Sequence, residues 1–404
     1  MVRGRWCCPP GRPGTPIASV PPIARWAGPG TTRGRRARSA ATNPLIPDYA
    51  GACLSNVVPA LFERDEPPPW LPPPVAGAGQ TVLLAVDGLG WDQLESRRSL
   101  APALAAMVGG PITTVAPSTT ATALSSLALG CPPGEHGVVG YRINVRGDVL
   151  NVLRWQTPAG DARVVIPPGE VQARPAFGGR CPPVVTRSEF AGTGFTAAHL
   201  RDVRLTGWRV TSTLVTEVRR HLAAGEPFVY AYYDGLDKVA HEYGLGEHYD
   251  AELASVDRLV ADLTAVLPAG AALAVTSDHG QVQVGDAIVP IRDEVMDCVE
   301  LLSGEGRFRW LHARPGAADD LAAAARACHG ERAWTRTREE VIAEQWFGPF
   351  VSEAAAARFG DVVLAAIDPV AFEDPADTGP YRLQSRHGSL TGAEMRVPLL
   401  ALRA

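Results

Sequence analysis

The chain has 404 residues, 46% of them hydrophobic and 20% charged, so it is long enough for one large domain or two, each with a substantial core. Its net charge is −5, yet residues 1–47 contain eight arginines and no acidic residue, so the remainder is acidic. A basic tail on an acidic body is not typical of a nucleic-acid-binding domain.

The first segment, residues 1–47, is rich in Pro, Gly and Arg and shows no periodicity, so we expect a disordered tail there and a catalytic domain over 48–404. Pro and Arg interrupt every candidate signal peptide, and no apolar run reaches the roughly 20 residues of a membrane span. The seven cysteines are odd in number and form no C-x-x-C pair, which favours a reduced, cytoplasmic compartment over a disulfide framework.

From about residue 81, short apolar runs alternate with helical stretches, a pattern typical of a mainly parallel sheet covered by helices on both faces. The clearest strands are expected at 81–88, 227–235, 272–280 and 361–369. Helices are expected at 211–225 and 250–267, where apolar residues recur at helical spacing. The segments at about 142–205 and 286–350 interrupt this rhythm and are expected to form small cap insertions.

One early stretch, "PSTTATALSSLALGCPPGEHGVVGY" (117–141), places Ser and Thr before an apolar helix that Gly130 ends, with His136 six residues further on. The hydroxyls have two interpretations. Ser and Thr commonly cap helices by accepting hydrogen bonds from free backbone N–H groups. Alternatively, one hydroxyl is a nucleophile at a helix N-terminus, where backbone amides and the macrodipole favour a bound anion. The stretch by itself favours caps.

Acidic residues follow three of the expected strands. Asp87 follows the first, Asp234 or Asp237 the second, and Asp278 the third. Asp-Gly is a common turn pair, so any one of these residues would be unremarkable. In open α/β sheets, however, the carboxyl ends of the strands border one ligand crevice, so we expect these carboxylates to converge.

Histidines accompany these acids. Asp237 and His241 lie four residues apart, which is one helical turn, and His279 directly follows Asp278. His387 stands beside a glycine just before a last apolar strand. A lone histidine is more often a cap or a hydrogen-bonded core residue. Together, three Asp and three His suffice for two divalent ions, first zinc, with manganese or another divalent ion as the alternative.

Competing chemistries lack their motifs. The "GLGWDQ" after the first strand has no third glycine of a dinucleotide fingerprint, and the single lysine, Lys238, follows no glycine loop of the P-loop type. No serine lies in a G-x-S-x-G elbow. Metal-assisted chemistry remains.

These motifs, in this order, resemble the type I phosphodiesterase and nucleotide pyrophosphatase family of the alkaline phosphatase superfamily. The resemblance covers roughly residues 78–404: Asp-Gly after the first strand, Thr before a helix ending in G-x-x-P-x-x-H-G, D-x-x-x-H-x-x-G, S-D-H-G and a late His-Gly. It implies an α/β, alkaline-phosphatase-like three-layer sandwich. It also implies two metal sites, one held by Asp87, Thr120, Asp278 and His279, the other by Asp237, His241 and His387.

The nucleophile is placed by the same resemblance. The family's threonine lies ten residues before the glycine that is Gly130 here, which gives Thr120, with Thr119 and Thr122 as alternatives. Two family features differ. The aromatic residue that often follows the nucleophile and stacks on a nucleobase is Ala121. The asparagine that helps to hold the phosphoryl oxygen is replaced by Tyr141, although Asn144 is close and could serve.

The expected function is metal-dependent hydrolysis of phosphate esters, first phosphodiesters or nucleotide pyrophosphates, through a phosphothreonine and two divalent ions. The expected partner is a small-molecule phosphate ester or nucleotide, with neither nucleic acid nor membrane. Alternatives are a phosphomonoesterase or phosphonate hydrolase, in which Arg142 or Arg154 binds a dianionic phosphate, and an inactive binding protein on the same fold. The physiological substrate and the oligomeric state are not specified by these residues.

Overall fold

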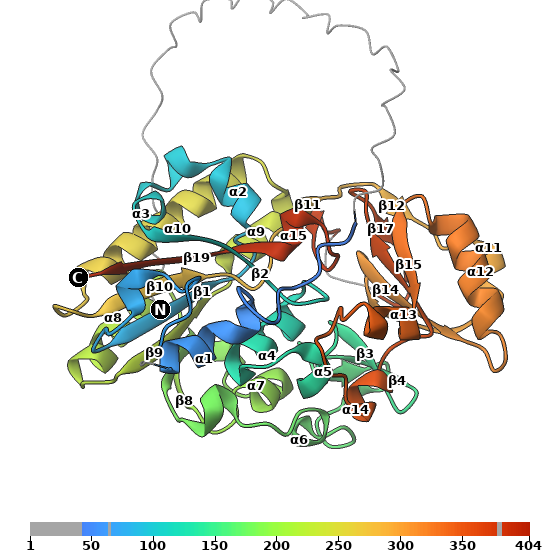
Figure 1. Ribbon diagram of the computed structural model, residues 1–404, viewed down its shortest axis with the longest axis horizontal. Helices are drawn as coiled ribbons and strands as arrows, with labels where there is room; N and C mark the ends of the chain where they lie inside the picture. Colours follow the sequence, from blue (N-terminus) through green and yellow to red (C-terminus); the bar gives the residue numbers. More distant parts are fainter. Residues whose placement is uncertain (1–42, 64–65, 378–381) are drawn as a thin grey trace, which may run out of the picture. The chain divides into compact units, whose positions relative to one another are not determined.

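A seven-stranded sheet, with strand order β2-β19-β10-β1-β9-β7-β8, forms the centre of the molecule in the computed structural model (Figure 1). Its strands are β1 (Thr81–Val86), β2 (Val108–Thr113), β7 (Pro183–Arg187), β8 (Arg204–Trp208), β9 (Phe228–Tyr233), β10 (Ala272–Thr276) and β19 (Arg396–Arg403). Only β19 runs antiparallel to its neighbours β10 and β2, and the other pairings are parallel. The mainly parallel sheet expected from the sequence is therefore confirmed.

Side chains along each strand point alternately to the two faces of the sheet. Both faces are therefore apolar, and helices cover both. Val82 and Leu84 of β1 belong to one apolar core, and Leu83 and Ala85 belong to the other. The helices of the first face are α2 (Trp91–Glu95), α3 (Pro102–Ala105), α8 (Thr211–Ala223), α9 (Gly235–Tyr243) and α10 (Glu247–Ala265). The helices of the second face are α1 (Val57–Phe62), α4 (Thr120–Leu129) and α7 (Gly194–His199). In Figure 1, α2, α3 and α10 lie on one side of the sheet and α1, α4 and α7 on the other.

A second, antiparallel sheet stands beside the first. Its four strands have the order β13 (Val299–Glu305), β14 (Phe308–Ala313), β16 (Val362–Ala366) and β15 (Ala333–Thr337). Leu311 and Leu364 pack under α12 (Ala318–His329), whereas Trp310 and Val363 on the opposite face join the core that contains α4. The two sheets thus share apolar packing.

Shorter elements complete the fold. A small sheet contains β3 (Arg142–Val145), β4 (Asp148–Asn151), β5 (Gln156–Thr157) and β6 (Gly160–Asp161). Two-stranded pairs are β11 (Val282–Gln283) with β18 (Ser385–Arg386) and β12 (Ile288–Val289) with β17 (Ala371–Phe372). The remaining α-helices are α5 (Pro133–His136), α6 (Pro168–Val171), α11 (Asp293–Met296), α13 (Arg338–Ala343), α14 (Glu353–Ala356) and α15 (Gly392–Met395). Short 3-10 helices are Leu54–Asn56, Pro73–Val75, Arg98–Leu100, Ala176–Gly179 and Ser188–Phe190.

The structure describes residues 43–63, 66–377 and 382–404, so most of the tail expected over 1–47 lies outside the described residues. Residues Pro44–Ala404 form one unit. This unit begins slightly before residue 48, because Leu45 and Ile46 pack against the core and the Leu45 N–H donates to the carbonyl of Leu390 at 2.9 Å. Within the described ranges, no helix combines the length and the apolar character that crossing a bilayer requires.

Two strand placements differ from the expectation. The segment 142–205 was expected to be an insertion, but β7 and β8, at its end, join the central sheet. The strand expected at 361–369 is β16, which belongs to the second sheet and pairs with β14 and β15. Its five residues are all buried, as they would also be in a central strand, so burial alone could not assign it to a sheet.

Candidate metal centre and catalytic cleft

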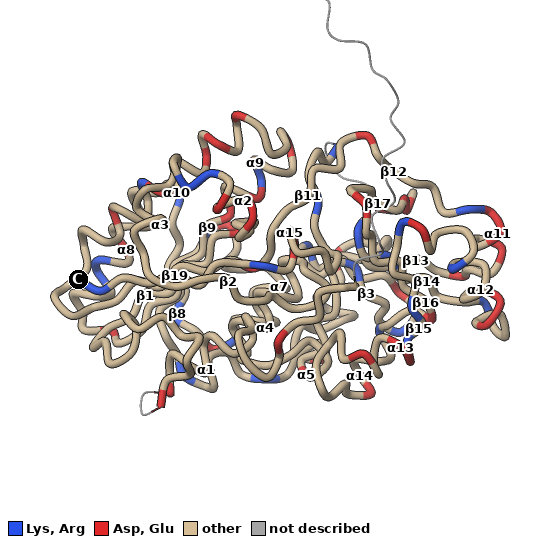
Figure 2. The backbone as a smooth tube through the Cα atoms, turned by 45° about the horizontal axis from the view of Figure 1, so that its top comes forward, with Lys and Arg blue, Asp and Glu red and all other residues tan. Residues whose placement is uncertain are grey.

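The expected metal ligands converge at the carboxyl end of the central strands. Asp87 directly follows β1, Asp278 and His279 follow β10, and α9 begins just after β9 and brings Asp237 and His241 to the same edge. Figure 2 shows acidic positions gathered where β9, α9 and α2 lie close together. The convergence follows from the parallel strands, because their carboxyl ends share one edge of the sheet.

Thr120 is the first residue of α4 and points its hydroxyl toward this cluster. Its Oγ1 lies 3.1 Å from Nε2 of His279, and the residue is 9% exposed. Thr119 occupies the N-cap position but makes no side-chain cap hydrogen bond, and the buried hydroxyl of Thr122 has no partner among the described residues. The cap interpretation therefore explains neither of these threonines, and the first-turn amides remain free to donate.

Two groups of side chains have the geometry to hold metal ions. One is Asp87, Asp278 and His279, and the other is Asp237, His279 and His387, each with ligand atoms within 4.8 Å of one another. Nε2 of His279 lies 3.4 Å from Oδ1 of Asp87 and 3.4 Å from Oδ2 of Asp278. His279 contributes to both groups because its ring stacks on that of His387, with centroids 3.5 Å apart.

His241 adjoins the second group. Its Nε2 lies 3.3 Å from Oδ1 of Asp237 and 3.3 Å from Nε2 of His387. Nδ1 of His241 donates to the carbonyl of Ser385 at 2.8 Å, and Nδ1 of His387 donates to that of Ser118 at 3.0 Å. In the neutral form of each ring Nε2 is then the unprotonated nitrogen, and two such lone pairs face each other, which a cation between them would stabilise.

The carboxylates of the first group also fit a metal. Oδ1 of Asp87 and Oδ2 of Asp278 are buried without a hydrogen-bond partner in the described structure, whereas buried carboxylate oxygens are normally satisfied. Burial, followed by the charges of Asp278 and Asp237, raises the pKa of Asp87 well above its usual range. Burial and the neighbouring histidines lower the pKa of His387 well below its usual range. A clustered set of orphan acceptors with a neutral imidazole is the donor set that a divalent cation requires.

Asp234, the alternative to Asp237, has other partners. Its carboxylate pairs with Arg187 at 2.6 Å and with Lys238 at 2.6 Å. The four-residue spacing of Asp237 and His241 thus selects the residue that lies in the cluster.

Asn144 is not brought to this cluster. It lies on β3, where Nδ2 donates to Nδ1 of His312 at 3.4 Å and Oδ1 accepts from the N–H of Gly147 at 2.8 Å. Both ends of the amide are therefore used to hold the β3–β4 turn and its neighbour. Tyr141, rather than Asn144, lines the cleft, and its hydroxyl accepts from Nδ2 of Asn151 at 2.7 Å.

Two cavities meet at Thr120, Leu153, Asp237 and Lys238, which line both. The apolar cavity has a volume of about 230 Å³, and Phe190, Phe195, Tyr230 and Tyr232 are among its lining residues. The polar cavity has a volume of about 420 Å³, and its walls include Arg154, Glu305, Asp377 and Arg386. A bound substrate can therefore extend from Thr120 in two chemically different directions.

The family model of type I phosphodiesterases and nucleotide pyrophosphatases matches residues 81–203 and 159–390, which include the metal-ligand candidates and Thr120. The chain belongs to this family. Family membership makes it a phosphodiesterase/nucleotide pyrophosphatase-type hydrolase, as the sequence motifs indicated. No curated protein sequence matches the chain.

The fold of this phosphodiesterase-family protein is similar to two solved structures. Murine ectonucleotide pyrophosphatase/phosphodiesterase 5 has a TM-score of 0.61 and 16% identity, covering 80% of this chain and 88% of that chain. An inactive variant of the murine protein was solved in complex with AMP. Phosphonoacetate hydrolase from Sinorhizobium meliloti 1021, in complex with phosphonoacetate, has a TM-score of 0.59 and 18% identity, covering 81% and 91%. These likenesses confirm the alkaline-phosphatase-like fold.

The family motif's histidine, His136, has a structural place in this phosphodiesterase fold. Its Nδ1 accepts from the N–H of Val138 at 3.1 Å, so Nε2 carries the proton and donates to the hydroxyl of Ser126 at 2.8 Å. Burial lowers its pKa to about 3. His136 therefore fastens the turn after α5 to α4, the helix that begins at Thr120.

Four residues near the candidate metal centre of this family member were not predicted from the sequence. The Tyr232 hydroxyl donates to Asp87. Gln281 donates to Oδ1 of Asp237 at 2.5 Å and accepts from the Ser385 hydroxyl at 2.9 Å. Gln281 and Arg386 each lie within two residues of a predicted ligand, which was an available signal.

The fourth residue, Glu305, gave no such signal, because it reaches the cleft from β13. Burial raises its pKa to about 8, although a hydrogen bond from Thr119 opposes this effect.

Proposed function

We propose that the protein hydrolyses phosphodiesters or nucleotide pyrophosphates with Thr120 as the nucleophile and two divalent ions, first zinc, as cofactors. The observation that supports this most strongly is the position of the Thr120 hydroxyl, 3.1 Å from His279, a residue common to both candidate metal groups. A threonine held only for packing would have no reason to face a cluster of unsatisfied ligands.

The ligand sets follow from the contacts. Asp87, Thr120, Asp278 and His279 would hold one ion, and the second would lie among Asp237, His241 and His387. When bound, such ions stabilise the charge on an attacking alkoxide and on a departing oxygen. Mixed carboxylate and imidazole donors suit zinc, and manganese is the alternative to test.

The chain's own groups account for the remaining steps. The Thr120 hydroxyl gives up its proton to solvent and its oxygen attacks phosphorus, while the bond to the leaving oxygen breaks and that oxygen leaves as an anion or takes up a proton from solvent. The phosphoryl or nucleotidyl group is then held on Thr120. Free amides of the first turn of α4, including that of Ala121, donate to the phosphoryl oxygens. Water then attacks from the side that the leaving group vacated, which releases the product and regenerates the hydroxyl.

One of the two arginines considered for a dianionic phosphate has another partner. Arg142 is buried and ion-paired with Asp374, which leaves Arg154 at the cavity. The AMP complex of the murine relative supports a nucleotide substrate. Although Ala121 offers no ring to a base, Phe190 and Tyr232, with centroids 6.4 Å apart, give the apolar cavity an aromatic wall.

The inactive-protein alternative predicts a damaged centre. Instead, every predicted Asp and His ligand lies in the cluster, and each of the three histidines points Nδ1 at a backbone carbonyl. Such orientation of the imidazoles is typical of working metal sites.

The test uses purified protein loaded with zinc or with manganese. The substrates are bis-p-nitrophenyl phosphate, p-nitrophenyl phosphate and a dinucleotide. We expect diester or dinucleotide turnover to exceed monoester turnover, and Thr120→Ala to reduce it about a thousandfold or more. Thr122→Ala removes a hydroxyl from the same helix and should retain turnover. Preference for the monoester, or equal losses in both variants, would overturn the proposal.

A further inference from the structure

Arg386 lines the catalytic cleft and forms no ion pair with any described residue. It is the last residue of β18, immediately precedes His387 and lines the polar cavity together with Thr120 and Arg154. Its Nε is buried and has no hydrogen-bond partner, and no ion pair joins its guanidinium to any described residue. An arginine has five N–H donors that form strong hydrogen bonds. Burying part of a guanidinium without hydrogen-bond partners therefore costs free energy of folding.

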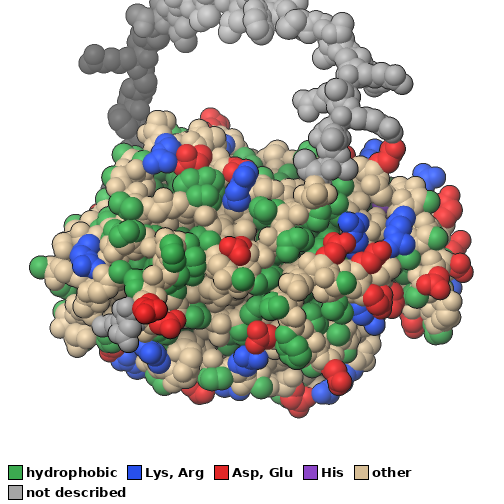
Figure 3. Space-filling model, viewed as in Figure 1, with side chains coloured by type: hydrophobic (Ala, Val, Ile, Leu, Met, Phe, Trp, Pro, Cys, Tyr) green, Lys and Arg blue, Asp and Glu red, His purple; other side chains and the backbone are tan. Residues whose placement is uncertain are grey.

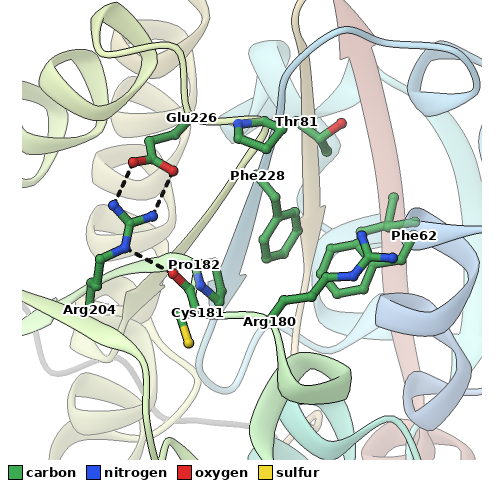
Figure 4. Close-up of a pocket in the computed structure, with 10 residues that line it drawn as sticks. Phe62, Thr81, Arg180, Cys181, Pro182, Arg204, Glu226 and Phe228 are labelled. Atoms are coloured by element: carbon green, nitrogen blue, oxygen red, sulfur yellow. Dashed lines mark hydrogen bonds and ion pairs between the residues drawn. The ribbon is translucent and has the colours of Figure 1, made fainter.

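Other arginines of the described structure show how this fold normally treats such groups. Arg307, fully buried, donates to Glu394 at 2.6 and 2.8 Å. Figure 4 shows a cavity at the other edge of the central sheet, where Arg204 forms two hydrogen bonds with Glu226, at 2.6 and 2.7 Å. In the same cavity Arg180 lies over the ring of Phe62, 4.3 Å from its centroid. Arg386 differs because its buried Nε has no hydrogen-bond partner among the described residues, and the residue lines the cleft.

Gly306 makes room for this arrangement. A Cβ added at Gly306 would lie 3.0 Å from Nη1 of Arg386 and 3.0 Å from the Cβ of Ala371, closer than ordinary contacts. The guanidinium therefore rests against the backbone between β13 and β14, and a side chain at 306 would displace it. The carboxylates in the same cavity have other contacts: Asp377 accepts from Arg309 at 3.4 Å, and Glu305 accepts from Thr119.

The position of Arg386 relative to the two metal-ligand groups indicates what it would bind. Thr120 contacts His279, whereas Arg386 adjoins His387, which belongs to the group that includes Asp237 and His241. In an in-line displacement the leaving group departs on the side away from the nucleophile. The polar cavity is lined by Asp237, His241 and His387, and also by Arg386 and Arg154.

We propose that Arg386 recognises a second anionic group, phosphate or carboxylate, on the leaving part of the substrate. This inference rests on the proposed function, since it assigns the departing group to the polar cavity. It makes the preferred substrate a phosphate ester or anhydride whose leaving group carries its own charge, as in a pyrophosphate linkage. A guanidinium binds such planar or tetrahedral anions through two parallel hydrogen bonds.

The test compares three substrates that transfer the same thymidylyl group. The leaving group is pyrophosphate in thymidine triphosphate, a carboxylate-bearing phenol in the para-carboxyphenyl ester, and an uncharged-ring phenol in the para-nitrophenyl ester. Arg386→Gln should lower kcat/KM about 10- to 100-fold for the first, the second or both, and less than about threefold for the third. A lower kcat/KM for thymidine triphosphate indicates phosphate recognition, and a lower kcat/KM for the para-carboxyphenyl ester indicates carboxylate recognition. An equal loss on all three, or no loss on any, would overturn the proposal.

Two further variants separate recognition from charge and folding. Arg382→Gln removes an arginine four residues away that pairs with Asp286 at 2.6 Å, and it should leave the substrate ratios unchanged. Gly306→Ala keeps the charge but crowds the guanidinium, and it should shift the ratios in the same direction as Arg386→Gln. A Gly306→Ala protein with wild-type ratios would count against the proposed position of the guanidinium.

Binding of inorganic pyrophosphate gives a readout that does not need turnover. Calorimetry on the full chain should show affinity at least tenfold weaker in Arg386→Gln than in wild type and in Arg382→Gln. If wild-type protein turns over none of the three esters, the proposed function is wrong, while this binding comparison still decides whether Arg386 recognises an anion. Equal pyrophosphate affinity in wild type and Arg386→Gln would contradict the proposal.

Discussion

His136 should make the stability of the protein depend on pH between neutrality and mild acid. The imidazole is 3% exposed and is held neutral by the Val138 N–H and the Ser126 hydroxyl. Burial, then the charges of Arg174 and Arg358, lowers its pKa from 6.5 to about 3. A group whose pKa is lower in the folded chain takes up its proton on unfolding, so its contribution is full above 6.5 and is lost as the pH falls toward 3.

The size of the effect follows from the two pKa values. At about pH 5 the unfolded chain carries the proton and the folded chain does not, so His136 lowers the free energy of unfolding by about 2 kcal/mol relative to about pH 7. His136→Gln should lose stability at neutral pH, by about 1–3 kcal/mol for the broken hydrogen bonds. Its further loss on acidification should then be about 2 kcal/mol smaller than that of wild type.

The assay is urea unfolding of wild type and variants at the two pH values. Ser126→Ala is the matched control, because it removes the hydroxyl partner but keeps the titrating ring. It should be less stable at neutral pH and retain the full pH dependence. If His136→Gln loses as much stability on acidification as wild type does, then His136 is not the titrating group and the reasoning fails.

Three further predictions concern the rest of the framework. Glu394→Ala leaves the buried guanidinium of Arg307 without its partner, so the free energy of unfolding should fall by about 3–5 kcal/mol in urea titrations, and a loss below about 1 kcal/mol would refute a structural role for this pair. Thr119→Ala should change kcat less than about tenfold, because the Thr119 hydroxyl donates to Glu305 rather than to a metal-ligand candidate, and abolished turnover would reassign the nucleophile. Metal analysis after dialysis should find about two divalent ions per chain, and folded, active protein with almost none would exclude the two-metal centre.

Surface charge of both signs is mixed on one face of the molecule. On the face shown in Figure 3, basic and acidic side chains are interspersed rather than gathered by sign. A nucleic-acid-binding surface typically concentrates lysine and arginine in one patch or stripe.

Most of the metal-ligand candidates were predictable because the sequence patterns that indicate them are local. Asp87 and Asp278 each follow an apolar strand, and parallel strands bring such residues to one edge. The spacing of Asp237 and His241 selected the ligand on α9, since residues four apart share a helix face. His387 was a candidate because it precedes the last apolar strand, but its place in the cluster depends on the pairing of β18 with β11, about 100 residues away in the chain.

The second sheet and the small sheet of β3 to β6 were less predictable because their contacts are long-range. The buried run of β16 carries no mark of which sheet it joins, and β7 begins with a proline in a segment rich in turn residues. Asn144 seemed a plausible phosphoryl ligand by proximity in sequence, but the turn it closes with Gly147 holds its amide elsewhere. Glu305 reaches the cleft only through the packing of the second sheet, which no local pattern reports.

The central claim is that substrate phosphorus becomes bound to Thr120, and acid quenching during turnover tests it most directly. Metal-loaded protein is mixed with a dinucleotide, quenched in acid, digested and mapped by mass spectrometry over residues 117–141. The account predicts a phosphorylated or nucleotidylated peptide modified at Thr120 and absent from the Thr120→Ala protein. Modification at Thr119 or Thr122, or normal turnover by the Thr120→Ala protein, would contradict it.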